Sequence, residues 1–536
     1  MSNTFRPPCD QGVILSGVAA APCSKSAAPW ILTSTILGSS MAFVDGTVVN
    51  VALPALQTNL NATAVDIQWV VESYALFLAA LLLVGGSLGD RFGRKLIYAI
   101  GIGIFALASA WCGFAPSVGQ LIIGRAIQGI GGALLVPGSL AIISASFGEE
   151  QRGEAIGTWS GFTAITAAIG PVIGGWLIEH ISWRAAFFIN LPLAAIVLIL
   201  VFRYVPESRN ENTQAGLDWW GVILATTGLG ILVYGLIESS NLGLFHPIVL
   251  ASVAAGIVIL VIFVAAEARI RNPMLPLTLF RSKNFAGANL LTLFLYAALS
   301  GALFFYPLNL IQVQGYSATA AGAAFLPFIL IMFFLSRWSG GLVKRYGARL
   351  PLVIGPMIAG FGFALFAVPG VSNNYWTSFF PAIVVLGFGM AISVAPLTTT
   401  VMNSVKGNQS GIASGINNAV SRTAGLLAVA IFGVAMMHTF NKQLDHRLAK
   451  IEMNHNAQHL IDQQRQKMAA LEIPATLNDT IRNLLRQAVN DSFVSAFRLI
   501  MLMAAGLALT SSLVAWLMME KESDGHNIKG VSQDST

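Results

Sequence analysis

The strongest constraint on this chain is a series of fourteen apolar stretches, each long enough to cross a lipid bilayer. A transmembrane helix needs about 20 mainly apolar residues. Stretches of this kind lie at residues 30–54, 67–88, 96–115, 118–144, 154–178, 185–204, 219–238, 247–267, 285–308, 318–337, 350–370, 376–401, 413–437 and 493–518. All should be helical, because lipid cannot satisfy the backbone of an open strand. The sequence therefore predicts an all-α polytopic membrane protein whose fourteen transmembrane helices are arranged as 6 + 2 + 6.

The overall composition agrees with this class. Hydrophobic residues make up 55% of the chain and charged residues 10%, and the mean hydropathy of +0.71 is far above that of soluble globular proteins. The net charge of +6 indicates no nucleic-acid partner, because the excess cations of a membrane protein orient it and meet anionic headgroups of the lipid bilayer. The cysteines Cys9, Cys23 and Cys112 lack metal-ligand spacing, so we expect neither a metal site nor a disulfide. The sequence also has no phosphate-binding G-x-x-x-x-G-K-[ST] loop, so we predict no cofactor and an energy supply from a gradient.

Lysine and arginine residues alternate sharply between successive connections. One side of the membrane collects nineteen cations, whereas the short connections of the other side hold Arg184 alone. The nineteen are Arg6, Lys25, Arg91, Arg94, Lys95, Arg152, Arg203, Arg209, Arg269, Arg271, Arg281, Lys283, Arg337, Lys344, Arg345, Arg349, Lys406, Lys521 and Lys529. Short cation-rich connections stay in the cytoplasm. We therefore expect a cell-membrane protein, in a bacterium an inner-membrane protein, with both termini in the cytoplasm.

The long outer connection at residues 438–492 departs from this alternation. Its seven cations are nearly balanced by six acids, and its length largely exempts it from the charge rule. Apolar residues recur there at helical spacing, at Phe440, Leu444, Leu448 and Ile451 and again at Ile481, Leu484, Leu485 and Val489. We expect two or three amphipathic helices. They form either a solvated spacer or a cap that restricts the outer mouth or docks a partner, such as a periplasmic adaptor protein.

An internal repeat divides the chain into two halves. A shift of 254 residues aligns GSLGDRFGRK at 86–95 with GGLVKRYGAR at 340–349. Self-similarity of this kind indicates duplicated structural units. The expected regions are a cytoplasmic tail at 1–29, a six-helix bundle at 30–204, two extra linker helices with flanking loops at 205–284, a second six-helix bundle at 285–518 that includes the outer segment, and a cytoplasmic tail at 519–536.

The first copy of the repeat is a tight basic hairpin, which we call the conformational loop. Its key residues are Gly86, Asp90, Arg91, Gly93, Arg94 and Lys95. The glycines let the backbone turn and approach closely, and the three cations mark the cytoplasmic side. The second copy keeps the turn but has Lys344 in place of the acid and Ala348 in place of Arg94.

Charged residues inside the apolar stretches are candidate functional residues, because a charge at mid-bilayer costs about 2.5–3.5 kcal/mol on insertion scales. We single out four: Asp45, Glu72, Arg125 and Arg422. With a rise of about 1.5 Å per residue, Asp45 lies ~16 Å below the outer surface, Arg125 ~12 Å and Glu72 ~8 Å. Asp45 and Arg125 could therefore meet, either as a static ion pair or as a proton site whose affinity depends on conformation. Glu72 is either a further proton-coupling residue or shallow enough to reach the outer water.

Several motifs together resemble those of one transporter family. The loop matches G-x-L-x-D-R-x-G-R-K, and the fourth apolar stretch matches R-x-x-Q-G-x-G-G through Arg125, Gln128, Gly129, Gly131 and Gly132. In the fifth stretch Gly170, Pro171, Gly174 and Gly175 match G-x-x-x-G-P-x-x-G-G, although Thr166 replaces its first glycine. These motifs resemble the major facilitator superfamily. WRAAFFINLP (183–192), LDWWG (217–221) and GIASGINNAVSRTAG (411–425) are similar to its fourteen-helix drug:proton antiporter branch.

The resemblance implies a monomeric transport unit whose two six-helix halves rock about a central site. It also implies that the loop's acid and arginines act as a clasp on the cytoplasmic face, and that the fifth-helix motif marks an antiporter. The leading hypothesis is a secondary active transporter that exports amphipathic, cationic drugs or toxic compounds in exchange for protons. The alternative is a transporter of the same fold that exports or imports one specific metabolite. An intramembrane enzyme or channel is disfavoured, because no His/Asp/Glu ligand set recurs at helical spacing in the apolar stretches.

Overall fold

The computed structural model describes residues 27–520, apart from 148, 210–217, 271–272, 274, 372–373, 406–409, 452–454 and 474–476. The predicted cytoplasmic tails lie outside the described residues except at 27–29 and 519–520, and so do Cys9 and Cys23. Every regular element in the described part of the chain is a helix. The prediction of an all-α polytopic membrane protein is confirmed, whereas the 6 + 2 + 6 arrangement stays a prediction.

Six long helices come first along the chain, and we call them the first half. They are α2 (Ala28–Asn59), α3 (Ala64–Phe92), α4 (Arg94–Phe114), α5 (Val118–Ser146), α6 (Glu149–His180) and α8 (Asn190–Tyr204), the last preceded by the short α7 (Ala185–Phe188). Local chemistry sets the start of α3. The Thr63 hydroxyl accepts a hydrogen bond from the Asp66 amide at 3.1 Å, and the Asp66 carboxylate accepts one from the Thr63 amide at 2.8 Å. This reciprocal cap satisfies amides that the first helical turn leaves without partners.

The next helices along the chain are α9 (Trp219–Leu242) and α10 (Pro247–Glu267), followed by the short η1 (Leu277–Arg281). We call the helices after them the second half. The second half contains α11 (Lys283–Leu308), η2 (Asn309–Val313), α12 (Ala318–Ala323), α13 (Leu326–Gly340), α14 (Leu342–Tyr346), α15 (Arg349–Phe366), α16 (Tyr375–Asn403), α17 (Ser410–Leu448) and α19 (Asp479–Met518). Thirteen helical stretches of the described residues are long and apolar enough to cross a membrane, and α6 is not among them.

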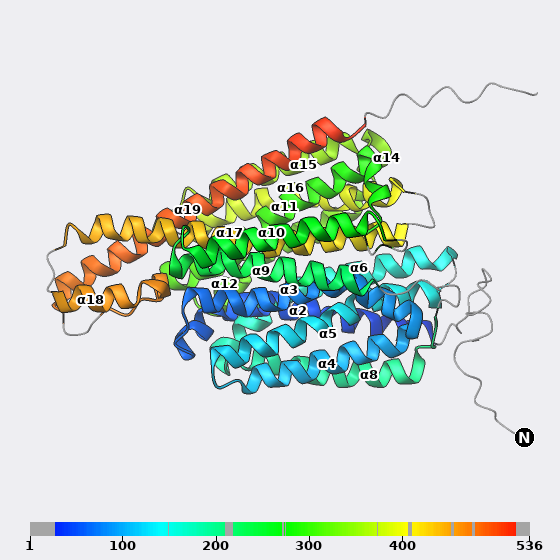
Figure 1. Ribbon diagram of the computed structural model, residues 1–536, viewed down its shortest axis with the longest axis horizontal. Coiled ribbons are helices and arrows are strands. Elements are labelled where there is room, and N and C mark those ends of the chain that lie inside the picture. Colours follow the sequence, from blue (N-terminus) through cyan, green and yellow to red (C-terminus); the bar gives the residue numbers. More distant parts are fainter. Residues whose placement is uncertain are drawn as a thin grey trace, which may run out of the picture.

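The long helices lie side by side, and the described chain begins and ends at the end of the bundle opposite α18 (Figure 1). The two halves meet where α6 packs on α12 and α13, α3 on α17, and α2 on α11. α9 packs on both α3 and α17, in a cluster that contains Val65, Leu229 and Leu426. α10 packs on α9 and leaves most of its apolar surface exposed, as expected for a helix that faces lipid.

The outer segment, residues 438–492, is built largely from extensions of membrane helices. α17 and α19 continue into it, and between them lie α18 (His455–Gln463) and the short η4 (Arg465–Ala470). Figure 1 shows this segment projecting beyond one end of the bundle. Phe440, Leu444 and Leu485 are fully buried, so the predicted amphipathic helices are present. Leu484 departs from the prediction because it is exposed.

Candidate functional site

Asp45 and Arg125 form an ion pair inside the first half. Asp45 lies on α2 and Arg125 on α5, and the distance from Arg125 Nη1 to Asp45 Oδ2 is 2.5 Å. The exposed fractions of the two side chains are 0% and 1%. The two residues thus meet as their expected depths predicted, while their role in proton coupling stays a prediction.

Three further polar side chains complete the surroundings of the Asp45 carboxylate. Gln128 Nε2 donates to Asp45 Oδ1 at 2.8 Å, and Asn190 Nδ2 donates to the same oxygen at 3.2 Å. Both amides also donate to Ser109 Oγ, at 2.7 and 3.2 Å. All three side chains are fully buried. Because buried polar groups need partners, this network holds the carboxylate in one orientation.

Sequence reasoning found Gln128 through its motif but missed Ser109 and Asn190. Ser109 lies in an unremarkable stretch of α4, and Asn190 lies at the start of α8. The only available signal was that Asn190 belongs to WRAAFFINLP, a stretch matched for its resemblance and not for its chemistry.

The Arg125 guanidinium is held by the first half alone. Its Nε donates to the Val70 carbonyl oxygen at 3.1 Å, and its Nη1 donates to Gln128 Oε1 at 2.6 Å. Its Cζ lies 4.2 Å from the centroid of the Tyr74 ring, which adds a cation–π contact. A buried ion pair is stable only when its geometry is good and its remaining groups are hydrogen-bonded. The pair meets both conditions here, and a change of helix position would remove them.

Glu72 lies apart from this network, and the expectation that it reaches the outer water is wrong. Its side chain is fully buried, and neither carboxylate oxygen has a hydrogen-bond partner among the described residues. Val65 and Leu76 lie on the same stripe of α3 and pack toward α9 and α17. Depth along α3 predicted water contact, but the packing of α9 and α17 against this face excludes water. Burial of a carboxyl without hydrogen-bond partners is energetically costly.

Arg422, the fourth intramembrane charge, lies on α17 at the contact between the halves. Its Cζ is 5.9 Å from the centroid of the Phe43 ring on α2. Phe43 precedes Asp45 by two residues, so Arg422 connects the second half to the helix that carries the ion pair.

The conformational loop turns between α3 and α4 at Gly93, whose φ of 115° lies in the left-handed region. A Cβ there would also lie 2.6 Å from Glu207 Oε1, so only glycine fits. The Glu207 carboxylate accepts hydrogen bonds from the amides of Lys95 at 3.1 Å and Leu96 at 3.2 Å. A negative group at a helix N-terminus is stabilising. Sequence reasoning missed Glu207 because it lies 112 residues after Lys95 in a polar connection.

The loop's acid and one arginine form an ion pair. Arg94 Nη2 and Nε lie 2.8 and 2.9 Å from Asp90 Oδ1. Arg91 stacks over the Phe92 ring at 5.4 Å. Among the described residues, the partners of these side chains all lie in the first half. The clasp that the resemblance implies stays a prediction.

Asp90→Asn is expected to slow transport while the substrate affinity stays nearly unchanged, whereas Lys344→Asn should have a mild effect. An exposed pair spaced i, i+4 contributes only about 0.3–0.5 kcal/mol to stability, so folding should survive the change. Initial rates and apparent affinities for a fluorescent dye in everted vesicles measure both quantities. Equal losses of rate in the two variants would refute a special role for the first copy of the loop.

The glycine motif of the fifth stretch, Gly170, Pro171, Gly174 and Gly175, forms two close contacts, one on each side of α6. Gly170 and Gly174 face α2, where an added Cβ would collide with Thr47 Oγ1 and, at 2.6 Å, with Val48 Cγ1. Small residues let two helices approach closely in a membrane. The motif therefore fixes α6 against the helix that carries Asp45.

The other side of the motif faces the second half. A Cβ added to Gly175 would collide with the Ala318 carbonyl oxygen, and one added to Gly322 would collide with the Pro171 carbonyl oxygen. Beyond these contacts, at the end of α6, the Thr319 hydroxyl and amide donate to Glu179 Oε2 at 2.5 and 3.3 Å. These hydrogen bonds lower the pKa of the Glu179 carboxyl. A lowered pKa means that the contact is complete at neutral pH and weakens as the pH falls through that pKa.

The fold and the site define a class, a polytopic membrane transporter built of two helical halves around buried charges. The chain belongs to the Major Facilitator Superfamily, whose family model matches residues 35–429. It is 30% identical over 514 residues to the tetracenomycin C resistance and export protein of Streptomyces glaucescens, and this alignment covers 95% of each chain. It is 34% identical over 425 residues to the multidrug resistance protein Stp of Mycobacterium tuberculosis, 78% of each chain.

Solved structures show the same fold. A bacterial homologue of the human lysosomal transporter Spinster, in an inward-facing conformation, superposes with a TM-score of 0.64 at 18% identity, over 92% of this chain and 98% of that one. The POT family transporter PepTSo gives a TM-score of 0.62 at 16% identity, over 93% of this chain and 98% of that one. The family and the two resistance proteins indicate a multi-pass membrane transporter of small molecules that works as a single chain.

Proposed function

We propose that this protein exports amphipathic drugs or toxic compounds, mainly cations, in exchange for protons by alternating access. The single observation that carries the proposal is the sealed network around Asp45, an ionisable group held inside the first half by one cation and two amides. The names of the relatives support export, since two of them are a resistance and export protein and a multidrug resistance protein.

The mechanism rests on two features, the buried charge on α2 and the contact of α6 with α12, which in the proposed topology closes the outer face. α6 packs on α12 of the second half and, through the opposite side of the same motif, on α2. Opening of the outer face would separate α6 from α12 and change the packing of α2. A nearby guanidinium favours the charged carboxylate, and its withdrawal in a desolvated site favours the protonated form. Asp45 would then bind a proton in one conformation and release it in the other.

The remaining predictions about partners belong to this proposal. The substrates are small molecules and protons, no cofactor takes part, and the protein lies in the bacterial inner membrane with both termini in the cytoplasm. Acids inside an apolar bundle are a physical basis for loose recognition of cations. A periplasmic adaptor would have to dock on the outer segment.

Everted vesicles test the proposal, because their outer surface is the cytoplasmic face. We expect uptake of several cationic dyes when a proton gradient, acidic inside the vesicles, is imposed, and its collapse when a protonophore is added. Uptake of one metabolite only would favour the alternative, a specific metabolite transporter. Dye uptake that is indifferent to the gradient would contradict proton antiport.

The orientation is tested by the single-cysteine variants Ser2→Cys, Asn241→Cys and Ser532→Cys in a background without native cysteines. The charge asymmetry predicts that the thiols at positions 2 and 532 are shielded in intact cells, whereas the thiol at position 241 reacts with an impermeant maleimide. Labelling in permeabilised cells controls for reactivity. Reaction of the Ser532→Cys variant from outside intact cells would rule out the fourteen-helix topology.

A further inference from the structure

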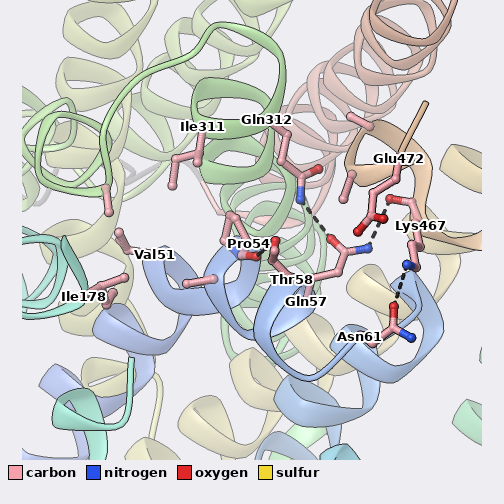
Figure 2. Close-up of a pocket in the computed structure, with 14 residues that line it drawn as sticks. Val51, Pro54, Gln57, Thr58, Asn61, Ile178, Ile311, Gln312, Lys467 and Glu472 are labelled. Carbon is pink, nitrogen blue, oxygen red and sulfur yellow. Dashed lines mark hydrogen bonds between the residues drawn. The ribbon is translucent and has the colours of Figure 1, made fainter. Parts of the chain in front are cut away.

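A cavity of about 380 Å³ lies between the two halves and the outer segment, separate from the Asp45 network. Its walls come from α2, α6, η2, α12 and η4 (Figure 2). The volume falls within the roughly 300–1,000 Å³ typical of small-molecule pockets. Ile178 and Ala318 line it, so it begins where the contact between α6 and α12 ends.

Hydrogen bonds between three separate segments build this outer pocket. Gln312 of η2 donates from Nε2 to Gln57 Oε1 of α2 at 2.9 Å. Gln57 Nε2 in turn donates to the Lys467 carbonyl oxygen at 3.1 Å, and Lys467 Nζ donates to Asn61 Oδ1 at 2.5 Å. Figure 2 shows the three bonds running across one side of the pocket. First half, second half and outer segment are thereby tied together at this point.

Two residues beside the pocket, Asn61 and Met468, have an uncommon backbone conformation. Asn61 and Met468, with φ of 51° and 52°, are the two non-glycine residues of positive φ among the described residues, and both lie at this contact. Met468 is buried and lines a smaller cavity with Phe304 and Phe305 of α11. Uncommon backbone conformations persist where the surroundings determine them, and they cluster at functional sites.

The pocket has the chemistry of a site for an amphipathic cation. Val51, Pro54 and Ile311 supply apolar surface, and the amides of Gln57 and Gln312 supply polar groups. The Lys467 ammonium is engaged by Asn61. The Glu472 carboxylate also lines the pocket, and no hydrogen bond or ion pair to it is found in the described part of the chain. The pocket thus holds one charge of each sign, and the carboxylate is the one that a bound cation can pair with.

We propose that this outer pocket is a second ligand site, in which the exported compound is held between the closed outer face and the outer segment before it leaves. Its ligand is an amphipathic monocation small enough for the cavity. The nature of the ligand rests on the proposed function, but the existence of the site does not. A ligand there touches both halves and the outer segment at once.

The test is protection of an introduced thiol in the pocket by ethidium, an amphipathic cation. Thr58 lines the pocket, and its neighbour Asn59 is exposed and does not. The purified full-length protein carries Thr58→Cys or Asn59→Cys, without native cysteines, and reacts with a water-soluble maleimide. We expect ethidium to slow labelling at position 58 in a saturable manner and to leave the labelling at position 59 unchanged.

Two pairs of variants locate the protection. Ala470→Trp fills the pocket and should abolish the protection by ethidium. Ala449→Trp, on an exposed face of the outer segment, should leave the protection intact. Glu472→Gln should raise the ethidium concentration for half protection about threefold, since exposed ion pairs are weak. Asp479 is exposed and lies outside the pocket, so Asp479→Asn should leave this ethidium concentration unchanged.

The outcomes separate the two proposals. Labelling of the Thr58→Cys variant that is unaffected by ethidium, equal slowing in the Asn59→Cys variant, or protection that survives Ala470→Trp would overturn the outer site. This assay needs no transport. Protection without any proton-driven dye export would therefore refute the proposed function and leave the outer site standing.

Discussion

Asp45→Asn is expected to reduce proton-driven dye export to the level seen without a gradient, the largest effect of any single change in this protein. Asparagine is nearly isosteric and can keep the hydrogen bonds to Gln128 and Asn190, but it cannot bind and release a proton. Because the buried Arg125 guanidinium loses its partner, the variant should be about 3–5 kcal/mol less stable to unfolding, and the protein that folds should still equilibrate dye down a concentration gradient. Uphill uptake and dye counterflow in the same everted vesicles measure the two properties separately.

A matched variant separates proton coupling from structural support. Ser109→Ala removes a hydrogen-bond partner of Gln128 and Asn190 and changes no charge. Ser109→Ala should lower the free energy of unfolding by about 1 kcal/mol and keep uphill export. Arg125→Ala should instead lose both stability and uphill export, since a buried ion that loses its partner costs about 3–5 kcal/mol. If Asp45→Asn still concentrates dye, the proton site lies elsewhere, and Glu72 becomes the next residue to replace.

Gly322→Ala is expected to lower export by more than tenfold by preventing closure of the outer face. The added Cβ would collide with the backbone carbonyl of Pro171, which cannot move away as a flexible side chain can. α12 and α6 would have to separate, and a transporter that cannot close its outer face cannot pump uphill. A thiol introduced by Thr319→Cys, at the outer end of this contact, should become more reactive toward a water-soluble maleimide.

Gly119→Ala is the matched control, because nothing lies within 4 Å of the Cβ it would add near the start of α5. It should leave export unchanged and raise stability slightly, since alanine is favoured over glycine in helices by about 0.5–1 kcal/mol. Normal export by Gly322→Ala, with the thiol at position 319 no more reactive than before, would mean that the contact between α6 and α12 is not the outer gate.

The sequence alone determined the helices and the depth of the ion pair. Each apolar run becomes a helix because lipid leaves the backbone no other partner, and the fixed rise per residue sets the height of every side chain. Asp45 and Arg125 were predicted to meet on this basis, and they do. The glycines of the loop and of the fifth-stretch motif were also recognisable, because glycine lies where a turn or a close approach requires it.

Only the tertiary structure decided which way the side chains face and what covers them. Height along a helix says nothing about rotation around its axis, so depth left open whether Glu72 reaches the outer water, and the structure buries it on the face of α3 that packs against α9 and α17. Ser109, Asn190 and Glu207 gained their roles from helices or connections distant in the sequence. The outer pocket likewise exists only because η4 returns to α2 across 410 residues of chain. Helix packing sets such contacts through the shapes of both surfaces together, and neither surface alone contains that information.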